Sequence, residues 1–424
     1  MFLAHNGIYG LHNSCFLTTF AELIYIFTHL FECSKRKSNV TKSNGQVNST
    51  EQKNRRDTAM TGNEKILKTI SAFATEGNIA NIEPLGNGLI NDTFIVRTKA
   101  NDTPDYVLQR INTKIFTNVE LLQHNIDTVT RHIRKKLEAE GIGDINRRVL
   151  QFLATESGRT YTQDEDGDCW RMSVYIPETQ TLETVDTKSS YSAGLAFGNF
   201  ESLLADLDEP LGETIPHFHD MELRAKQLAD AVSEDRVGRL FDVSDEVSFI
   251  DSISNDMCRG EQLFREGLLP KRICHCDTKV NNMLTDANGN VLCIIDLDTV
   301  MPSFVFSDYG DFLRTAANSA TEDESDIDRI SFREDIFKSF TEGYIRSTRD
   351  FLTDIERNNL PYAVALFPYM QATRFLTDYL NGDVYYKTMF DEHNLVRTRN
   401  QLELLRQILE RMPAIEKFIR NCGE

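Results

Sequence analysis

The segment 275–282, His-Cys-Asp-Thr-Lys-Val-Asn-Asn, is the sequence feature that most restricts how this chain can fold. It places Asp277 five residues before Asn282, and an apolar run leads to Asp296, fourteen residues beyond that asparagine. An aspartate that can accept a hydroxyl proton, with an asparagine and a second aspartate that can hold Mg²⁺, forms the acidic half of a phosphoryl-transfer site. The fold must therefore bring a loop and the end of a following strand to one place.

Each residue type in this pattern has a chemical reason to be there. Mg²⁺ prefers hard oxygen ligands and usually takes only one or two from the protein, which suits Asn282 and Asp296. A carboxylate beside an acceptor hydroxyl can orient that group and take its proton, which suits Asp277. Lys279 can offer a point charge to a transferred phosphoryl group. The combination predicts a small-molecule kinase with ATP as co-substrate and Mg²⁺ as cofactor.

The composition excludes several other classes of protein. The 424 residues have room for about two or three average domains, or for one two-lobed enzyme. A net charge of −19 argues against a nucleic-acid partner, because phosphate backbones require clustered Lys and Arg. The eight cysteines show no disulfide-like spacing, which favours reduced thiols and a cytoplasmic protein. Cys274, His275 and Cys276 do not predict a zinc site, since neighbouring strand residues point to opposite faces and no second Cys/His cluster follows.

The first sixty residues differ from the rest of the chain. They carry a net charge of +3, from seven Lys/Arg and four Asp/Glu, and are rich in polar residues from Ser34 onward. The apolar run 16–31 contains Glu22 and is shorter than the ~20 residues that cross a bilayer. No basic residues precede it, as a secretory signal would need. We expect residues 1–60 to be a disordered or spurious extension and expect no membrane partner; a signal anchor is the alternative.

Residues 61–178 predict a first, nucleotide-binding lobe built around a small antiparallel sheet. Gly86-Asn87-Gly88 lies between the first two strands, where glycines would let backbone N–H groups approach phosphate oxygens, although a plain hairpin turn has the same pattern. Pro177 ends the last strand as a hinge, with the backbone of 174–176 facing adenine. The predicted helices are 63–76 and 118–140, and the predicted strands are 79–85, 92–97, 105–111, 149–154 and 169–176.

Two charged residues of this lobe are candidates for the nucleotide site. Arg110, near the end of the third strand, could reach the nucleotide phosphates, and a guanidinium can serve phosphate in a bidentate way. Glu120, in the first turn of the long helix, is a candidate partner for Arg110. The alternative for Glu120 is an exposed carboxylate favoured by the helix dipole.

Residues 179–424 predict a second, mostly helical lobe that carries the catalytic residues. A hairpin formed by 282–285 and 291–295 would deliver Asn282 and Asp296 to one place. Asp308 and Asp311 follow shortly afterwards and are expected to brace the 275–282 loop. The loop 215–220 is expected to cap the helix after it. The predicted helices are 191–207, 219–240, 245–266, 327–349, 354–380 and 394–420.

The chain resembles the aminoglycoside phosphotransferase-like kinases, and within them the N-acetylhexosamine 1-kinases. The resemblance runs from about Gly77 to the last predicted helix. It is carried by 275–282 and by 295–302, Ile-Asp-Leu-Asp-Thr-Val-Met-Pro. Further similar runs are 88–93, 107–112, 215–220 and 372–385.

The resemblance implies an α+β, bilobal, protein-kinase-like fold and phosphorylation of the anomeric hydroxyl of N-acetylglucosamine or N-acetylgalactosamine by ATP. It implies that Asp277 is the base, with Asn282 and Asp296 holding Mg²⁺. The sugar contacts that it implies are Arg374 and Tyr385, with Asn91 and Asp92 adding polar contacts from the lobe interface. The nucleotide-side candidates remain Gly86, Gly88, Arg110 and Glu120.

Two other interpretations stay open at this stage. One is a kinase of another small alcohol: choline, which would call for an aromatic cage, homoserine, or an aminoglycoside, which would call for an acidic cleft. The other is a pseudokinase that binds nucleotide without turnover, which would be expected to lack one of Asp277, Asn282 and Asp296.

Overall fold

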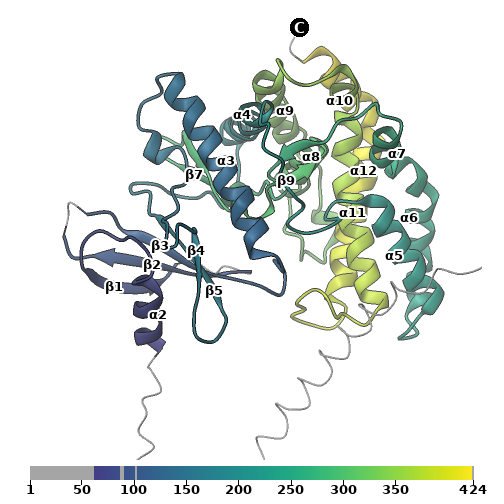
Figure 1. Ribbon diagram of the computed structural model, residues 1–424. Helices are drawn as coiled ribbons and strands as arrows, with labels where there is room; N and C mark the ends of the chain where they lie inside the picture. Colours follow the sequence, from purple (N-terminus) through teal and green to yellow (C-terminus); the bar gives the residue numbers. More distant parts are fainter. Residues whose placement is uncertain (1–61, 86–89, 101–102, 423–424) are drawn as a thin grey trace, which may run out of the picture. The chain divides into compact units, whose positions relative to one another are not determined.

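The computed structural model describes residues 62–85, 90–100 and 103–422 (Figure 1). The first lobe holds a five-stranded antiparallel sheet in the order β1-β2-β3-β5-β4. Its elements are α2 (Gly62–Ile70), β1 (Ile79–Pro84), β2 (Asp92–Thr98), β3 (Tyr106–Ile111), α3 (Val119–Ala139), β4 (Tyr161–Gln163) and β5 (Cys169–Val174).

The long helix α3 forms where its apolar spacing predicted. Asn118 caps it, because the side chain of Asn118 accepts a 3.0 Å hydrogen bond from the N–H of Leu121. Its apolar stripe packs on one face of the sheet, where Leu122 and Ile126 meet Ile111 and Cys169. Helix α2 covers the other face through a second cluster, formed by Ile70, Phe73, Val96, Tyr106, Leu108, Trp170 and Met172.

The second lobe is mostly helical, and its apolar core lies between the helices. Helices α4 and α9 pack together, as do α11 and α12. Its helices are α4 (Thr187–Leu204), α5 (Met221–Glu234), α6 (Ser244–Met257), α7 (Arg259–Arg265), α8 (Phe306–Ala316), α9 (Glu334–Thr348), α10 (Asp354–Asn358), α11 (Leu360–Leu380) and α12 (His393–Asn421).

Two small antiparallel ribbons in this lobe frame the 275–282 loop. β6 (Arg272–Cys274) pairs with β9 (Met301–Ser303), and β7 (Met283–Thr285) pairs with β8 (Val291–Ile294). The predicted hairpin of 282–285 and 291–295 is therefore confirmed. The loop leaves β6 and enters β7, so its two ends are fixed by different ribbons.

Several element boundaries differ from the sequence predictions. Residues 149–154 form only an isolated bridge, between Phe152 and Ser173, and the short strand β4 was not predicted. The predicted helix 354–380 divides into α10 and α11, because Pro361 starts a new helix in its first turn. The predicted helix 245–266 divides at Cys258, which leaves the helical conformation.

Two expectations about the environment of the chain can be compared with the described residues. None of the helices in that part of the chain is both long and apolar enough to cross a bilayer. The six cysteines within it are free thiols.

Candidate active site

Asp277, Lys279 and Asn282 lie together, as the sequence predicted. Lys279 Nζ is 2.9 Å from Asp277 Oδ1. The Asn282 Nδ2 group donates to the Asp277 carbonyl oxygen at 2.8 Å and to Oδ2 at 3.3 Å. Burial lowers the pKa of Lys279, but the negative charges of Asp277 and Asp311 outweigh it and raise the pKa overall. A permanently charged ammonium thus stands beside the carboxylate.

Asp308 holds the 275–282 loop from behind. Its carboxylate accepts hydrogen bonds from the backbone N–H groups of His275 (2.8 Å) and Cys276 (2.7 Å), and its carbonyl oxygen accepts one from Thr278 Oγ1 (2.8 Å). These bonds keep Cys276 at φ +63°, a left-handed conformation that is unfavourable for a residue with a side chain. The expected bracing by Asp308 is confirmed. Asp311 instead pairs with Arg314 at 3.1 Å.

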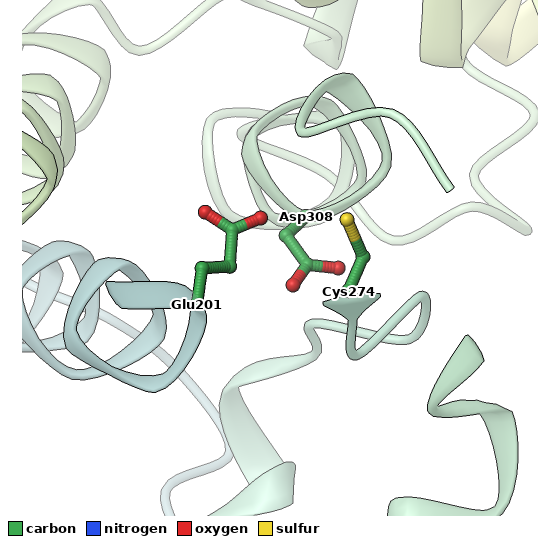
Figure 2. A group of neighbouring side chains, drawn as sticks. All are labelled: Glu201, Cys274 and Asp308. Atoms are coloured by element: carbon green, nitrogen blue, oxygen red, sulfur yellow. The ribbon is translucent and has the colours of Figure 1, made fainter. Parts of the chain in front are cut away.

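A buried group of acids and a thiol lies behind this brace (Figure 2). Glu201 of α4, Cys274 of β6 and Asp308 bring one oxygen or sulfur atom each to within 4.8 Å of one another. Burial, and then the charge of Asp308, raise the pKa of Glu201 well above its usual range, and burial likewise raises that of Cys274. Both groups therefore keep their protons. Since Asp308 already accepts two backbone N–H groups, this cluster is better described as a support of the loop than as a metal site.

The segment that carries Asp296 is joined directly to the loop. The Asn282 carbonyl oxygen accepts a 3.0 Å hydrogen bond from the N–H of Ile295, and His275 Nε2 lies 2.9 Å from the Ile295 carbonyl oxygen. These contacts bring Asp296 and Asn282 to one place, as the hairpin predicted.

Asp296 itself has an unusual backbone conformation and a raised pKa. Its backbone is left-handed, at φ +59°. Desolvation by the surrounding protein, and then the charges of Asp298 and Asp277, raise the pKa of Asp296 to about 6, although part of the side chain remains exposed. Asn282 uses its amide nitrogen on Asp277, which leaves its amide oxygen as an acceptor. The arrangement offers two hard oxygen ligands in a crowded anionic site, which suits a divalent cation.

Arg110, which was predicted to contact the nucleotide phosphates, forms its ion pairs within the first lobe. Arg110 pairs with Asp92 and, at 3.0 Å, with Asp168, and its guanidinium lies over Trp170. It alternates with Tyr106 and Leu108, so it lies on the sheet face that α2 covers. This placement does not support the predicted contact with phosphates, nor a sugar contact by Asp92.

The candidate pairing of Glu120 with Arg110 is not formed, and Glu120 is an exposed carboxylate, as in the alternative interpretation. Glu120 accepts a 2.7 Å hydrogen bond from Tyr161 Oη, and both residues line a groove of about 860 Å³ between the turn after α2, the start of α3 and β4. Glu120 and Arg110 are separated because they lie on opposite faces of the sheet. Gly86 and Gly88 lie outside the described residues.

Asn91 is buried between the lobes. Its Nδ2 group donates to Asp298 Oδ2 at 2.7 Å, and its Oδ1 atom accepts from the N–H of Asn112 at 2.9 Å. Asp298 also forms an ion pair with Arg171 of β5, and both side chains are almost fully buried. Asn91 therefore contacts the protein with both ends of its amide, and this geometry does not support a sugar contact.

Arg374 of α11 lies between aromatic side chains of the second lobe. Its guanidinium is over the rings of Phe218 and Tyr386, with 5.8 and 5.7 Å between its Cζ atom and the ring centroids. Phe218 stacks on His219 at 4.3 Å, and burial, together with the charges of Arg374 and Arg224, lowers the pKa of His219 to about 3. The imidazole is therefore neutral, and the positive charge here comes from arginine.

Arg224 adds a second guanidinium next to Arg374. Arg224 donates to the carbonyl oxygens of His217 (3.1 Å) and Phe218 (2.9 Å), while Arg374 donates to Gln371 at 2.8 Å. Burial and the charge of Arg374 lower the pKa of Arg224 to about 10. Neither arginine forms an ion pair with a carboxylate in the described part of the chain, so two guanidinium groups lie here without a directly bound anion.

Tyr385 lies in a loop that Asp378 organises. The Asp378 carboxylate accepts hydrogen bonds from the N–H groups of Val384, Tyr385 and Tyr386, at 2.8–2.9 Å, and one from Asn394 Nδ2. The Tyr385 side chain is 72 % exposed and its ring meets that of Tyr386 edge-on. The loop thus presents an aromatic side chain to solvent from a fixed backbone.

Sequence reasoning missed Arg171, Asp298 and Arg224 as parts of this region. A signal existed for Arg171, which is a single cation inside the apolar run Cys-Trp-Arg-Met-Ser-Val of β5. A lone charge in a buried strand needs a buried partner. The partner, Asp298, could not be identified because it lies 127 residues away.

Comparison with known proteins relates this geometry to a family. The structure is similar to that of an aminoglycoside phosphotransferase from Alicyclobacillus acidocaldarius, with a TM-score of 0.56, 11 % identity, and coverage of 87 % of this chain and 99 % of that one. It is also similar to an amicoumacin kinase (TM-score 0.54, 12 % identity, 82 % and 94 % coverage) and to a choline kinase from Cryptosporidium parvum (0.50, 15 %, 82 % and 95 %). These likenesses confirm the predicted bilobal α+β fold, with an antiparallel sheet in one lobe and helices in the other.

The sequence provides the family assignment itself. Residues 81–344 match the model of the phosphotransferase enzyme family, APH, and this span includes most of the sheet, the 275–282 loop and Asp296. The chain belongs to the APH phosphotransferase enzyme family.

Proposed function

We propose that this phosphotransferase is a Mg²⁺- and ATP-dependent kinase that phosphorylates the C1 hydroxyl of N-acetylhexosamines such as N-acetylglucosamine and N-acetylgalactosamine. The observation that carries the kinase assignment is the group formed by Asp277, Lys279 and Asn282 beside Asp296. A pseudokinase would be expected to lack one of Asp277, Asn282 and Asp296. All three residues are present and lie near one another. The amicoumacin kinase was solved with AMP-PNP and Ca²⁺, which supports a nucleotide and a divalent cation in this fold.

The proposed chemistry assigns one task to each side chain. The C1 hydroxyl loses its proton to the Asp277 carboxylate while its oxygen bonds to the γ-phosphorus and the bond from that phosphorus to ADP breaks. Lys279 places its charge where the phosphoryl group passes. Asn282 and Asp296 would hold Mg²⁺, which neutralises charge on the phosphates. An anomeric hydroxyl is more acidic than an ordinary alcohol, so positioning and charge account for most of the acceleration.

The region around Arg374 favours a neutral acceptor over a cationic one. The aromatic faces of Phe218 and Tyr386, which could surround a quaternary ammonium, already face the Arg374 guanidinium. Arg224 adds a second positive charge without a carboxylate partner in the described residues. A choline or an aminoglycoside would meet two like charges there, whereas the hydroxyl and amide oxygens of a sugar can accept hydrogen bonds from them.

Release of ADP with a panel of acceptors tests the proposal. We expect turnover with both N-acetylhexosamines and none with 1-deoxy-N-acetylglucosamine, which lacks the reacting hydroxyl. The 6-deoxy sugar should remain a substrate, and ³¹P NMR of the product should show coupling to the anomeric proton. Turnover with choline, homoserine or an aminoglycoside in place of the sugars would replace the acceptor assignment, and no turnover with any acceptor would favour a pseudokinase.

A further inference from the structure

Asp298, two residues after Asp296, connects the two lobes. One carboxylate oxygen, Oδ2, accepts the 2.7 Å hydrogen bond from Asn91, and the other, Oδ1, forms the ion pair with Arg171. Its carbonyl oxygen accepts a 2.9 Å hydrogen bond from Thr214 Oγ1. Asp298 is 3 % exposed, so these contacts are shielded from solvent.

On the side of the first lobe, this contact is made by Arg171. Its Nε donates to Gln109 Oε1 of β3 at 2.9 Å, and its Nη1 reaches Gln123 Oε1 of α3 at 3.4 Å. The side chain lies on the sheet face that meets α3, opposite to Arg110, and is 2 % exposed. A fully buried guanidinium requires an anionic partner, and Asp298 supplies it.

The segment after Asp296 is fixed at its far end as well. Asn125 of α3 donates to the carbonyl oxygen of Val300 at 2.9 Å, and Thr299 Oγ1 donates to the carbonyl oxygen of His275 at 2.7 Å. Asp296 thus begins a single helical turn, 297–299, that both lobes hold. A left-handed non-glycine residue persists only where its surroundings over-determine it, and these contacts provide that restraint at Asp296.

We propose that Arg171, Asn91 and Asp298 form an interlobe lock that positions Asp296 to bind the metal, and that Asp298 is a positioning residue and not itself a metal ligand. The proposal rests on the proposed function, because it assigns Asp296 as a ligand of Mg²⁺. Groups that hold metal ligands in place typically change metal affinity by about 10–100-fold when they are removed. The lock also makes the metal site depend on the sheet of the first lobe, where the nucleotide would lie.

The test measures binding of ADP to the full chain by calorimetry over a series of Mg²⁺ concentrations, without any acceptor. The lock is neutralised by combining Arg171→Met with Asp298→Asn, which leaves no unpaired buried charge. We expect the strengthening of ADP binding by Mg²⁺ to fall about 10-fold or more, while ADP binding without Mg²⁺ changes little. A merely structural role would lower the melting temperature and leave the Mg²⁺ response unchanged, and that result would overturn the proposal.

A matched control is Arg272→Met with Glu356→Gln. Arg272, which is partly exposed, and the buried Glu356 form an ion pair at 2.8 Å that is confined to the second lobe. This control should lose stability but keep the wild-type Mg²⁺ response. An equal loss of the response in the control would overturn the lock, because the effect would then follow from destabilisation alone.

Single variants distinguish the lock from direct metal binding by Asp298, and cover the case in which the double variant does not fold. Arg171→Met and Asn91→Ala should each weaken the Mg²⁺ response, as Asp298→Asn does. If Asp298→Asn alone weakens it and the other two leave it intact, Asp298 is a ligand and the lock is overturned. A wild-type chain whose ADP binding ignores Mg²⁺ would overturn the proposed function together with the lock, whereas an incorrect acceptor assignment leaves this assay unaffected.

Discussion

Asn282 donates from Nδ2 to the carbonyl oxygen of Asp277 at 2.8 Å, so the amide that would bind the metal also fixes the residue that would act as base. The same group reaches the Asp277 carboxylate at 3.3 Å. The orientation of the amide leaves its oxygen for a cation, and the loop geometry therefore determines both roles at once.

Asp277→Asn should abolish most turnover. The amide cannot take the acceptor proton, so kcat should fall by roughly 10²–10⁴-fold, while ATP binding stays near wild type because Asn282 and Asp296 are retained. Steady-state kinetics and nucleotide titration measure the two effects. Asp230→Asn, which removes an exposed carboxylate on α5 paired with Lys226, is the control. A variant at Asp277 that retained more than about a tenth of the turnover would contradict the assignment.

Arg374→Ala should weaken use of the acceptor without affecting the nucleotide. Loss of a charged donor commonly costs about 1.5–3 kcal/mol, so KM for the sugar should rise roughly 10-fold or more. KM for ATP should not change, because Arg374 contacts Phe218, Gln371 and Tyr386, which all belong to the second lobe. Arg399→Ala, on α12, serves as the control, since Arg399 pairs with Glu246 away from this region. An equal rise of both KM values would argue against a sugar contact.

Asp378→Ala should release the loop that carries Tyr385. Its carboxylate accepts three backbone N–H groups and the Asn394 amide, and leaving such donors buried and unpaired should cost roughly 3 kcal/mol or more in the free energy of unfolding. We expect KM for the sugar to rise with little change in KM for ATP. Chemical denaturation and kinetics measure both. Tyr385→Ala should raise KM for the sugar without the loss of stability, because its side chain is exposed.

Glu201→Gln should stabilise the protein at neutral pH. Burial and the charge of Asp308 raise the pKa of Glu201 well above its unfolded value of about 4.3, so the folded protein binds this proton more tightly than the unfolded chain. The free energy of unfolding is therefore highest below the unfolded pKa of Glu201. It falls as the pH rises toward the folded pKa, by up to about 1.4 kcal/mol per pH unit.

Glutamine removes this dependence because it keeps the acceptor for Tyr344 Oη and cannot ionise. Melting temperatures from pH 4 to pH 8 should therefore fall less steeply for Glu201→Gln than for wild type. The exposed Glu410→Gln should follow the wild-type curve. Lower stability of Glu201→Gln at pH 8 would show that the carboxylate is ionised and needed there.

The sequence predicted the parts of the site that are close together along the chain. The loop residues Asp277, Lys279 and Asn282 are neighbours, and a short hairpin brings Asp296 to them, so local spacing was sufficient. Helices such as α3 also follow from apolar periodicity, because one stripe of each is buried.

The residues that face each other across the sheet could not be predicted in this way. Strand β3 is apolar on both faces, so alternation does not show which face Arg110 occupies, and a one-residue shift moves it to the other side. The buried cation is Arg171, and its partner Asp298 comes from a distant part of the chain, as does Asn91, which donates to Asp298. Long-range pairing of this kind depends on the packing of whole elements, which local spacing does not contain.

The hydrogen bond from the Ile295 N–H to the Asn282 carbonyl oxygen has a consequence for turnover. It makes the base and both expected metal ligands parts of one connected piece of the second lobe. A movement of the sheet away from the helices would break the contacts of Asp298 with Arg171 and Asn91, and would therefore loosen Asp296. Asp277 would keep its place, because its hydrogen bond from Asn282 lies within the second lobe.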